Sequence, residues 1–315
     1  MRIGIIGLGS IGRRHVRALN SCGVREILAF RTGKGTLQNL DSDIDFVQNV
    51  TNFEDFKNKE LDGIIISNPT SEHISTLKKV IDLNVPIFVE KPLSHSLNEI
   101  STLDLRNNNI IVGYCLRFSP TIAFLKKELQ PLIGQLVKAS FKRSYYLPKW
   151  HPYADYRKEY TALKSLGGGV LKTLSHEIDL MLFLFEEEVI QVSGYAEKLS
   201  FLEIDTDDVA FFSCKVKSGA RVNFELDFLS PSNINRAEFY GENGVLRYDY
   251  TSKTIEFEGY DSTKQQWDIE DDDVDKMYVE QMQDFITFIK TGISRNTSLV
   301  EAIESMRIIN EIEGI

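Results

Sequence analysis

The 315-residue chain has few cysteines, and its three stand far apart. Cys22, Cys115 and Cys214 show neither the paired spacing of a metal site nor the even number of a disulfide framework, so we expect reduced thiols, a cytoplasmic location and no metal. No apolar run approaches the roughly 18 residues that a membrane-spanning helix needs. The sequence therefore predicts a protein without a membrane segment.

Long basic runs are also lacking. Lys and Arg number 36 against 46 Asp and Glu, which gives a formal net charge of -10. This net negative charge repels the phosphate backbone of a nucleic acid, and no local cluster of Lys and Arg offsets the repulsion. We expect a small-molecule substrate as the partner, rather than a nucleic acid or a membrane.

Short apolar runs alternate with amphipathic segments in the first third of the chain. This alternation is typical of βαβ crossovers and predicts a parallel sheet. The runs that we interpret as its buried strands are residues 3–6, 26–30, 64–66, 87–89 and 110–112.

The pattern changes after Phe118-Ser119-Pro120, where a helix is followed by runs of alternating polarity. These runs are residues 210–216, 220–228 and 236–240, and Lys217-Ser218-Gly219 between the first two is a plausible hairpin turn. A largely antiparallel sheet and two terminal helices, at 279–289 and 299–312, follow from this pattern. We predict two domains, 1–119 and 120–315, as expected for a chain of this length.

A glycine motif follows the first strand directly and opens a helix, which is the context of a dinucleotide-binding fingerprint. It consists of Gly7, Leu8, Gly9, Ser10, Ile11 and Gly12. Gly7 allows the tight turn, Gly9 lets the backbone approach a pyrophosphate, and Gly12 permits close helix packing. The fingerprint predicts a doubly wound Rossmann domain.

The end of the second strand lacks the Asp or Glu that binds the ribose 2′-hydroxyl in NAD enzymes. Phe30 stands near that position and is followed by Arg31, Thr32 and Lys34. These residues are suited to a 2′-phosphate, so we favour NADP over NAD as the cofactor.

Two further motifs follow apolar strands. Asn68-Pro69 comes after the strand at 64–66, and Glu90-Lys91-Pro92 comes after the strand at 87–89. Ligands of open parallel sheets bind beyond the carboxyl ends of the strands, so we expect Lys91 to point toward the nicotinamide.

A glycine run, Gly167-Gly168-Gly169, precedes a helical segment in the second domain. Thr173, His176 and Asp179 are spaced three apart in that segment, which predicts a shared helix face. Glycines permit close approach of a ligand, and imidazole ordinarily titrates near neutrality, which suits proton transfer.

Taken together, these motifs resemble the Gfo/Idh/MocA family, named after glucose-fructose oxidoreductase and inositol dehydrogenase. The resemblance rests on the fingerprint, Ser67-Asn68-Pro69 with His73, Glu90-Lys91-Pro92, and the glycine run with Ser175-His176-Glu177-Ile178-Asp179. It spans nearly the whole chain. It implies an N-terminal Rossmann domain and a C-terminal α/β domain with an open, mainly antiparallel sheet.

The resemblance also implies roles for individual residues. Lys91 and His176 match catalytic residues of the family, and the matches near the nicotinamide are Asn68, Pro69, His73 and Glu90. Tyr114 and Arg117 match a stretch near the substrate, to which we add Tyr160, Thr173 and Asp179. Many members carry an acid three or four residues before the histidine, where this chain has Thr173 and Lys172. Which of Lys91 and His176 accepts the proton therefore stays open.

The reaction implied is reversible hydride transfer between nicotinamide and a hydroxyl-bearing carbon of a sugar, cyclitol or sugar derivative. The segment from Tyr146 to Tyr160 is similar to relatives in surface-polysaccharide and nonulosonate-type sugar pathways. Relatives often form homodimers or homotetramers through the open sheet face. The alternatives are a non-catalytic NADP-binding sensor or regulator of the same fold, and a reductase of an imine or a non-sugar carbonyl.

Overall fold

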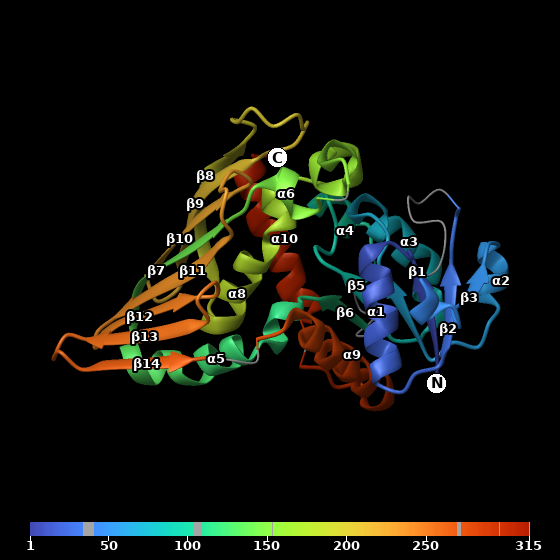
Figure 1. Cartoon of the computed structure of the whole chain (residues 1–315), viewed down its shortest axis with the longest axis horizontal. Helices are drawn as coiled ribbons and strands as arrows, with labels where there is room; N and C mark the ends of the chain where they lie inside the picture. Colours follow the sequence, from blue (N-terminus) through green and yellow to red (C-terminus); the bar gives the residue numbers. More distant parts are fainter. Residues whose placement is uncertain (34–40, 104–108, 153, 270–271, 296, 315) are drawn as a thin grey trace. The chain divides into compact units, whose positions relative to one another are not determined.

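The computed structural model describes residues 1–33, 41–103, 109–152, 154–269, 272–295 and 297–314 (Figure 1). The chain divides into two compact units. The first contains Met1–Phe118 and Asp273–Met306, and the second contains Ser119–Asp272 and Arg307–Ile315. Among the described residues, no helix combines the length and the apolar character needed to cross a bilayer.

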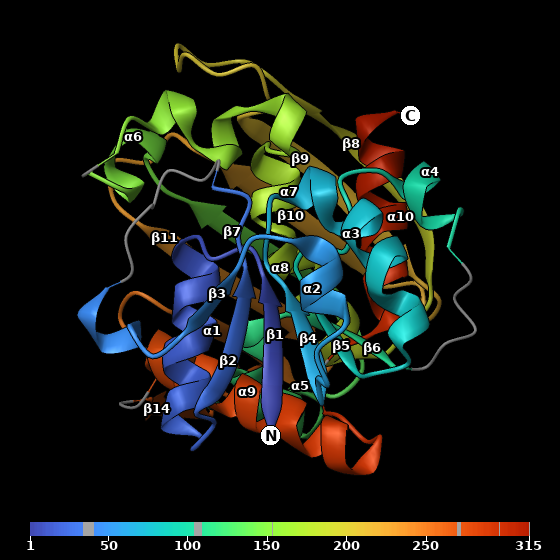
Figure 2. The same cartoon turned by 90° about the vertical axis from the view of Figure 1, so that its right-hand side faces the viewer.

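The first unit is built on a seven-stranded sheet in the order β15-β6-β5-β4-β1-β2-β3, and the strands from β6 to β3 are labelled in Figure 2. Its strands are β1 (Arg2–Ile6), β2 (Glu26–Phe30), β3 (Gln48–Val50), β4 (Gly63–Ile66), β5 (Ile87–Glu90), β6 (Ile110–Gly113) and β15 (Thr297–Ser298). The neighbours from β6 to β3 are parallel, and β15 joins β6 antiparallel. The predicted parallel Rossmann sheet is confirmed.

The helices of the first unit pack their apolar stripes on the faces of this sheet. They are α1 (Ser10–Ser21), α2 (Phe53–Lys57), α3 (His73–Val80), α4 (Leu97–Ile100), α9 (Val274–Thr291) and the first part of α10 (Leu299–Glu313). In α3 the side chains of Ile74, Leu77 and Val80 form a buried apolar stripe. Covering the sheet in this way removes its near-continuous apolar strands from water.

Helix α9 belongs to the first unit, whereas the sequence assigned it to the second domain, 120–315. Figure 1 shows α9 beside α1, and the two helices are in contact. The ring of Phe285 on α9 lies 5.6 Å from that of Phe88 on β5. A Cβ at Gly63 on β4 would come within 2.7 Å of Ile289. The apolar face of α9 therefore completes the core under β4 and β5, which a linear reading of the chain did not reveal.

The second unit contains an eight-stranded sheet in the order β14-β13-β12-β11-β7-β10-β9-β8. Its strands are β7 (Leu136–Ser144), β8 (Val189–Glu197), β9 (Val209–Val216), β10 (Arg221–Asp227), β11 (Ile234–Gly241), β12 (Gly244–Asp249), β13 (Thr254–Gly259) and β14 (Lys264–Asp268). The pair β7 and β10 is parallel, and the other neighbours are antiparallel. The predicted hairpin joins β9 to β10, so the mainly antiparallel sheet is confirmed.

Phenylalanine side chains form a row across the middle of this sheet. The ring of Phe224 on β10 stacks at 4.4 Å on Phe212 of β9 and at 5.2 Å on Phe141 of β7. Phe141 in turn meets Phe239 of β11 edge-on at 5.7 Å. Such cross-strand aromatic pairs stabilise a sheet and fix its register.

Helices cover the face of the sheet on which these phenylalanines lie. They are α5 (Pro120–Ile133), α6 (Leu147–Trp150), α7 (Val170–Thr173) and α8 (Ser175–Phe185), of which α5 contacts β11, β12 and α8. Helix α5 begins where the sequence predicted, because the Ser119 side chain caps it by accepting from the Ile122 N–H and Pro120 occupies its first turn.

Candidate active site

The glycines of the fingerprint differ in what surrounds them. A Cβ at Gly7, whose φ is +96°, would lie 2.5 Å from the Asn68 nitrogen, and one at Gly12 would lie 2.1 Å from the Gly7 oxygen. A Cβ at Gly9 meets nothing within 4 Å. Gly7 and Gly12 are therefore needed for packing, whereas Gly9 leaves open space beside the backbone.

That space lies at the N-terminus of α1. Gly9 is the N-cap, no side chain caps the helix, and its first turn, which includes Ser10 and Ile11, carries no acid. The first N–H groups of such a helix carry partial positive charge and attract a phosphate group. This end of α1 fits the pyrophosphate of a dinucleotide.

At the end of β2 an aromatic cluster stands where many NAD enzymes have an acid. The ring of Phe30 lies 5.0 Å from that of Phe53 and packs edge-on against it. The Arg31 N–H donates to the Val50 oxygen, which ties the strand end to β3. Thr32 follows on the surface, and Lys34 lies outside the described residues.

The sequence reasoning missed Asp41, an acid of the loop after β2. Its carboxylate accepts from buried Arg13 at 2.7 Å and from Arg17 at 2.5 Å. Both arginines come from α1. Asp41 therefore anchors the loop to the helix that begins at the fingerprint, and only the fold brings these groups together.

The loop after β4 holds Asn68, Pro69 and His73. The Asn68 side chain donates to Thr76 at 2.8 Å and to Glu72 at 3.2 Å. His73 is only 1% exposed, with Nδ1 at 2.9 Å from the Pro92 oxygen and Nε2 at 3.0 Å from the Asn68 oxygen. Burial lowers the pKa of His73, and the two carbonyls oppose this effect. This ring joins two loops, and its predicted contact with the cofactor stays a prediction.

The turn after β5 contains Glu90 and Lys91. Glu90 is 7% exposed, and its carboxylate contacts His15 at 2.7 Å and accepts from the Lys91 N–H at 3.1 Å. These contacts engage both carboxylate oxygens, and the predicted contact with the dinucleotide stays a prediction. Lys91 is half-buried and precedes Pro92 through a cis peptide bond.

Tyr114 and Arg117 follow β6, and the side chains of both are buried, while their predicted contact with a substrate stays a prediction. Tyr114 is fully buried. Arg117 is also buried, and its guanidinium lies 3.2 Å from the Glu301 carboxylate. Both residues belong to the packing of the first unit, since α10 supplies Glu301.

In the second unit the glycine run is packed against the chain itself. A Cβ at Gly168 would lie 2.2 Å from the Tyr160 oxygen, and one at Gly169 would lie 2.1 Å from Asp207 Oδ1. The Gly169 N–H donates to the Thr161 oxygen at 3.0 Å. The expectation that these glycines make room for a ligand is therefore replaced by a need for close backbone packing.

Thr173, His176 and Asp179 do not share one helix. Helix α7 ends at Thr173, Leu174 leaves the helical conformation, and α8 begins at Ser175 with His176 in its first turn. The Thr173 hydroxyl lies 3.4 Å from the hydroxyl of Tyr160, whereas Asp179 is fully buried. The structure thus brings Tyr160 and Thr173 together, keeps His176 half-buried, and removes Asp179 from the surface.

Asp207 is a second residue that the sequence reasoning missed. Its carboxylate accepts from the Leu171 N–H at 3.0 Å in the first turn of α7. Burial raises the pKa of Asp207, and the bond to Leu171 opposes this effect. Lys172, which stands where relatives place an acid, forms a buried ion pair with Glu313 of α10. The turn before His176 is thus held by charged groups that are distant in the sequence.

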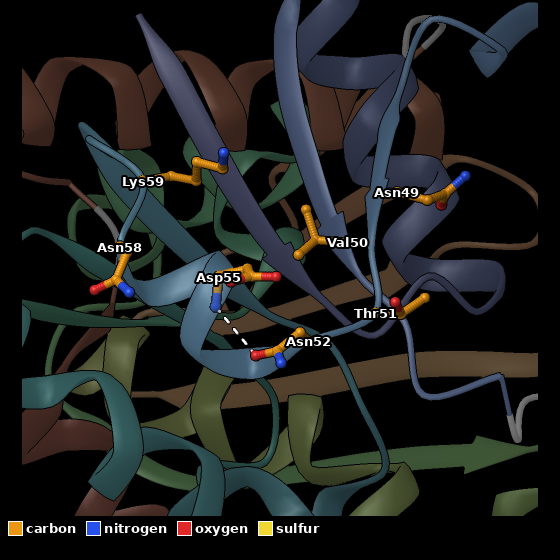
Figure 3. A pocket seen from close by; sticks show the side chains of 7 residues that line it. All are labelled: Asn49, Val50, Thr51, Asn52, Asp55, Asn58 and Lys59. Carbon is orange, nitrogen blue, oxygen red and sulfur yellow. Dashed lines mark hydrogen bonds between the residues drawn. The ribbon is translucent and has the colours of Figure 1, made fainter.

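A separate hollow of about 360 Å³ runs along β3 and α2 (Figure 3). Its lining consists of Asn49, Val50, Thr51, Asn52, Asp55, Asn58 and Lys59. None of the predicted site residues lines it. Within the described residues, no group of three or more His, Cys, Asp or Glu side chains is placed to hold a metal ion.

Family models match both parts of the chain. The model described as "Oxidoreductase family, NAD-binding Rossmann fold" matches residues 1–106. The model of the GFO/IDH/MocA C-terminal domain matches residues 130–247.

Curated relatives include dehydrogenases of cyclitols. The chain is 27% identical over 257 residues to scyllo-inositol 2-dehydrogenase (NAD(+)) of Bacillus subtilis, covering 78% of this chain and 73% of the relative. It is 24% identical to the rhizopine catabolism protein MocA of Rhizobium meliloti, covering 64% of this chain and 62% of the relative.

Solved structures share the fold over almost the full length. A levoglucosan dehydrogenase, in complex with NADH and levoglucosan, superposes with a TM-score of 0.85 at 18% identity and covers 99% of this chain and 96% of its own. UDP-N-acetylglucosamine 3-dehydrogenase GnnA of Acidithiobacillus ferrooxidans superposes with a TM-score of 0.79 at 16% identity, covering 100% and 97%. The solved structures share the fold, and the match of the two family models to residues 1–106 and 130–247 shows that the chain belongs to the GFO/IDH/MocA family of NAD-binding oxidoreductases.

Proposed function

We propose that this protein is an NAD(P)-dependent dehydrogenase that acts on a hydroxyl-bearing carbon of a sugar, cyclitol or sugar derivative. The observation that carries the proposal is the position of Lys91. It follows β5 at the same edge of the parallel sheet at which the fingerprint follows β1. In open parallel sheets, ligands bind at this edge.

The residues divide the chemistry between them. A nicotinamide held at the fingerprint would supply the hydride acceptor for the carbinol carbon. The protein would have to supply the base that takes the hydroxyl proton as the carbonyl forms. We assign the base to His176 and the polarisation of the oxygen to Lys91, with the reverse assignment as the variant to be tested. General acid-base catalysis of this kind contributes about 10² to 10⁴ in rate.

Alanine variants of the two residues test this assignment. Lys91→Ala and His176→Ala are each expected to lower turnover by about 10² or more, with dinucleotide affinity nearly unchanged. Lys59→Ala, at an exposed lysine, is the matched control and should behave as wild type. Full activity in both active-site variants would overturn the mechanism.

A panel of candidate substrates, assayed by the change in NAD(P)H absorbance, tests which compound the protein oxidises or reduces. The relatives suggest scyllo-inositol, levoglucosan and UDP-N-acetylglucosamine as probes, together with acidic sugars because of the resemblance of the Tyr146 to Tyr160 segment. Tight dinucleotide binding without turnover of any probe would favour the sensor alternative. Turnover of an imine or a non-sugar carbonyl alone would favour the reductase alternative.

For the cofactor we propose a preference for NADP. Support comes from the end of β2, where Phe30 packs into an aromatic cluster and Arg31 follows it with no acid at the strand end. The named relatives include an NAD(+) enzyme and a complex with NADH, so the two dinucleotides must be compared directly. Parallel fluorescence titrations should give a lower Kd for NADPH than for NADH, and the opposite order would reverse the assignment.

A further inference from the structure

A buried carboxylate stands one residue before Lys91. Glu90 ends β5 opposite Gly113 of β6. A Cβ at Gly113 would lie 2.4 Å from the Phe88 ring and 3.2 Å from Glu90 Oε1. The glycine therefore leaves room for the carboxylate between the strand and the core.

His15 of α1 is the partner of this carboxylate. It is fully buried, and its Nε2 lies 2.7 Å from Glu90 Oε1. Its ring meets Phe88 edge-on at 5.1 Å and Tyr278 at 5.4 Å. These contacts pack the ring in the core with its Nε2 directed at Glu90.

The surroundings of the second ring nitrogen indicate which nitrogen of His15 donates to Glu90. Nδ1 of His15 is buried and has no hydrogen-bond partner among the described residues. A proton on Nε2 is donated to the carboxylate, whereas a proton on Nδ1 would be buried without an acceptor. Geometry therefore favours Nε2 as the nitrogen that donates to Glu90.

The peptide of Lys91 is held on both sides. On one side, the other carboxylate oxygen of Glu90 accepts from the Lys91 N–H at 3.1 Å. On the other side, His73 contacts the Pro92 carbonyl oxygen at 2.9 Å. The backbone that presents the lysine is thus fixed by two buried histidines, one of them acting through Glu90.

We propose that His15 is a positioning residue for Lys91. It holds the Glu90 carboxylate, and Glu90 fixes the Lys91 backbone, so that the helix that opens at the dinucleotide fingerprint also orients the lysine. The importance of this placement for turnover rests on the proposed function of Lys91. A reacting group misplaced by about 1 Å can cost on the order of 10²-fold in rate.

The kinetic test compares His15→Leu with His15→Gln. Leucine removes the donor to Glu90, whereas the glutamine amide can replace Nε2. With the best substrate of the panel, His15→Leu should lower kcat about 10- to 100-fold with little change in KM. Its Kd for NADH should stay within about twofold of wild type, and His15→Gln should recover most of kcat. A loss of NADH affinity equal to the loss of kcat would overturn the proposal.

A second measurement needs no substrate. Reductive methylation, followed by mass spectrometry, gives the ratio of the methylation rate of Lys91 to that of exposed Lys59. We expect this ratio to rise in His15→Leu, because the lysine is no longer held, and to return to the wild-type value in His15→Gln. An unchanged ratio in folded His15→Leu would overturn the proposal.

If His15→Leu does not fold, Glu90→Gln decides in its place. It removes the charge that His15 contacts, and we expect the same rise in the Lys91 ratio. An unchanged ratio would again overturn the proposal. Wild-type protein without any turnover would refute the proposed function alone, since the methylation ratio would still decide whether His15 positions Lys91.

Discussion

Gly9 and Gly12 stand three residues apart, and their substitutions should separate binding from stability. The Cβ of Gly12→Ala would fall 2.1 Å from the Gly7 oxygen, whereas that of Gly9→Ala meets no atom within 4 Å. We expect Gly12→Ala to cost about 2 kcal/mol or more of unfolding free energy, as overpacked sites do. Gly9→Ala should leave stability within about 0.5 kcal/mol and weaken NADH binding. Urea unfolding and a fluorescence titration measure the two quantities.

Gly9→Ala and Gly12→Ala serve as controls for each other, because both variants add one methyl group to the same segment. Equal NADH affinity in Gly9→Ala and wild type would show that the open space beside Gly9 is not where the dinucleotide phosphate binds. Equal unfolding free energies for the two variants would show that the turn yields to accommodate the methyl group.

Cys115 should be protected from alkylation in the folded protein. Burial raises the pKa of Cys115 to about 12, from an ordinary value near 9. The thiolate is the reactive form, so the rate at pH 8 should fall about 10³-fold below that of the unfolded chain. Mass spectrometry after iodoacetamide treatment, with and without urea, measures this ratio, and half-buried Cys22 should react first.

The same shift predicts the pH dependence of stability. Because the folded-state pKa of Cys115 is raised, the unfolded chain releases the proton first as the pH rises. The contribution of this thiol to stability is complete below about pH 9 and is lost progressively toward pH 12. Cys115→Ser should therefore weaken the dependence of the unfolding free energy on pH between about pH 9 and pH 12. An identical pH dependence in the variant would contradict the raised pKa of Cys115.

At the residue scale, the sequence predicted where the site residues lie in the fold better than it predicted which side chains surround them. The fingerprint glycines and the place of Lys91 at the end of β5 follow from local pattern and strand direction. The burial of His73 and Glu90 does not, because it depends on partners such as His15, which comes from another element. Local pattern holds no information about which distant side chain fills a given volume.

At the element scale, apolar strands were predicted and polar ones were not. The five runs predicted in the first third coincide with β1, β2, β4, β5 and β6, whereas β3 was missed because Gln48-Asn49 is polar and exposed at the sheet edge. The helix predicted through His176 is interrupted at Leu174. The glycine run before α7 packs against Tyr160 and Asp207, and spacing alone shows neither this packing nor the interruption.

Helix α7 should depend on the close packing of Gly169. In Gly169→Ala the Cβ would lie 2.1 Å from Asp207 Oδ1, at a φ of +112°. Gly219→Ala, at a φ of +100° with no atom within 4 Å, adds the same backbone strain without the clash. We expect Gly219→Ala to cost about 1 to 2 kcal/mol and Gly169→Ala to cost more. Urea unfolding measures both, and equal losses would show that Asp207 moves aside.

At the scale of the whole molecule, one face of the sheet in the second unit displays apolar side chains. Tyr195 on β8 and Phe211 on β9 are exposed by 42% and 40%. The rings of Tyr195 and Phe211 lie 6.0 Å apart on opposed positions of the two strands. Adjacent exposed apolar groups of this kind mark interaction surfaces more often than isolated ones do.

We expect this surface to join copies of the chain into a homodimer or homotetramer. A stable interface needs about 800 Å² from each partner, which a face of several strands can supply. Light scattering should give a multiple of 36.0 kDa for the wild type. Tyr195→Lys combined with Phe211→Lys should shift the mass toward the monomer, because two desolvated ammonium groups oppose association. Phe201→Lys is the control, since this aromatic side chain is 78% exposed outside the strands. A monomeric wild type would show that the chain does not assemble through this surface. An equal shift in the control would show that the two lysines do not act on a specific interface.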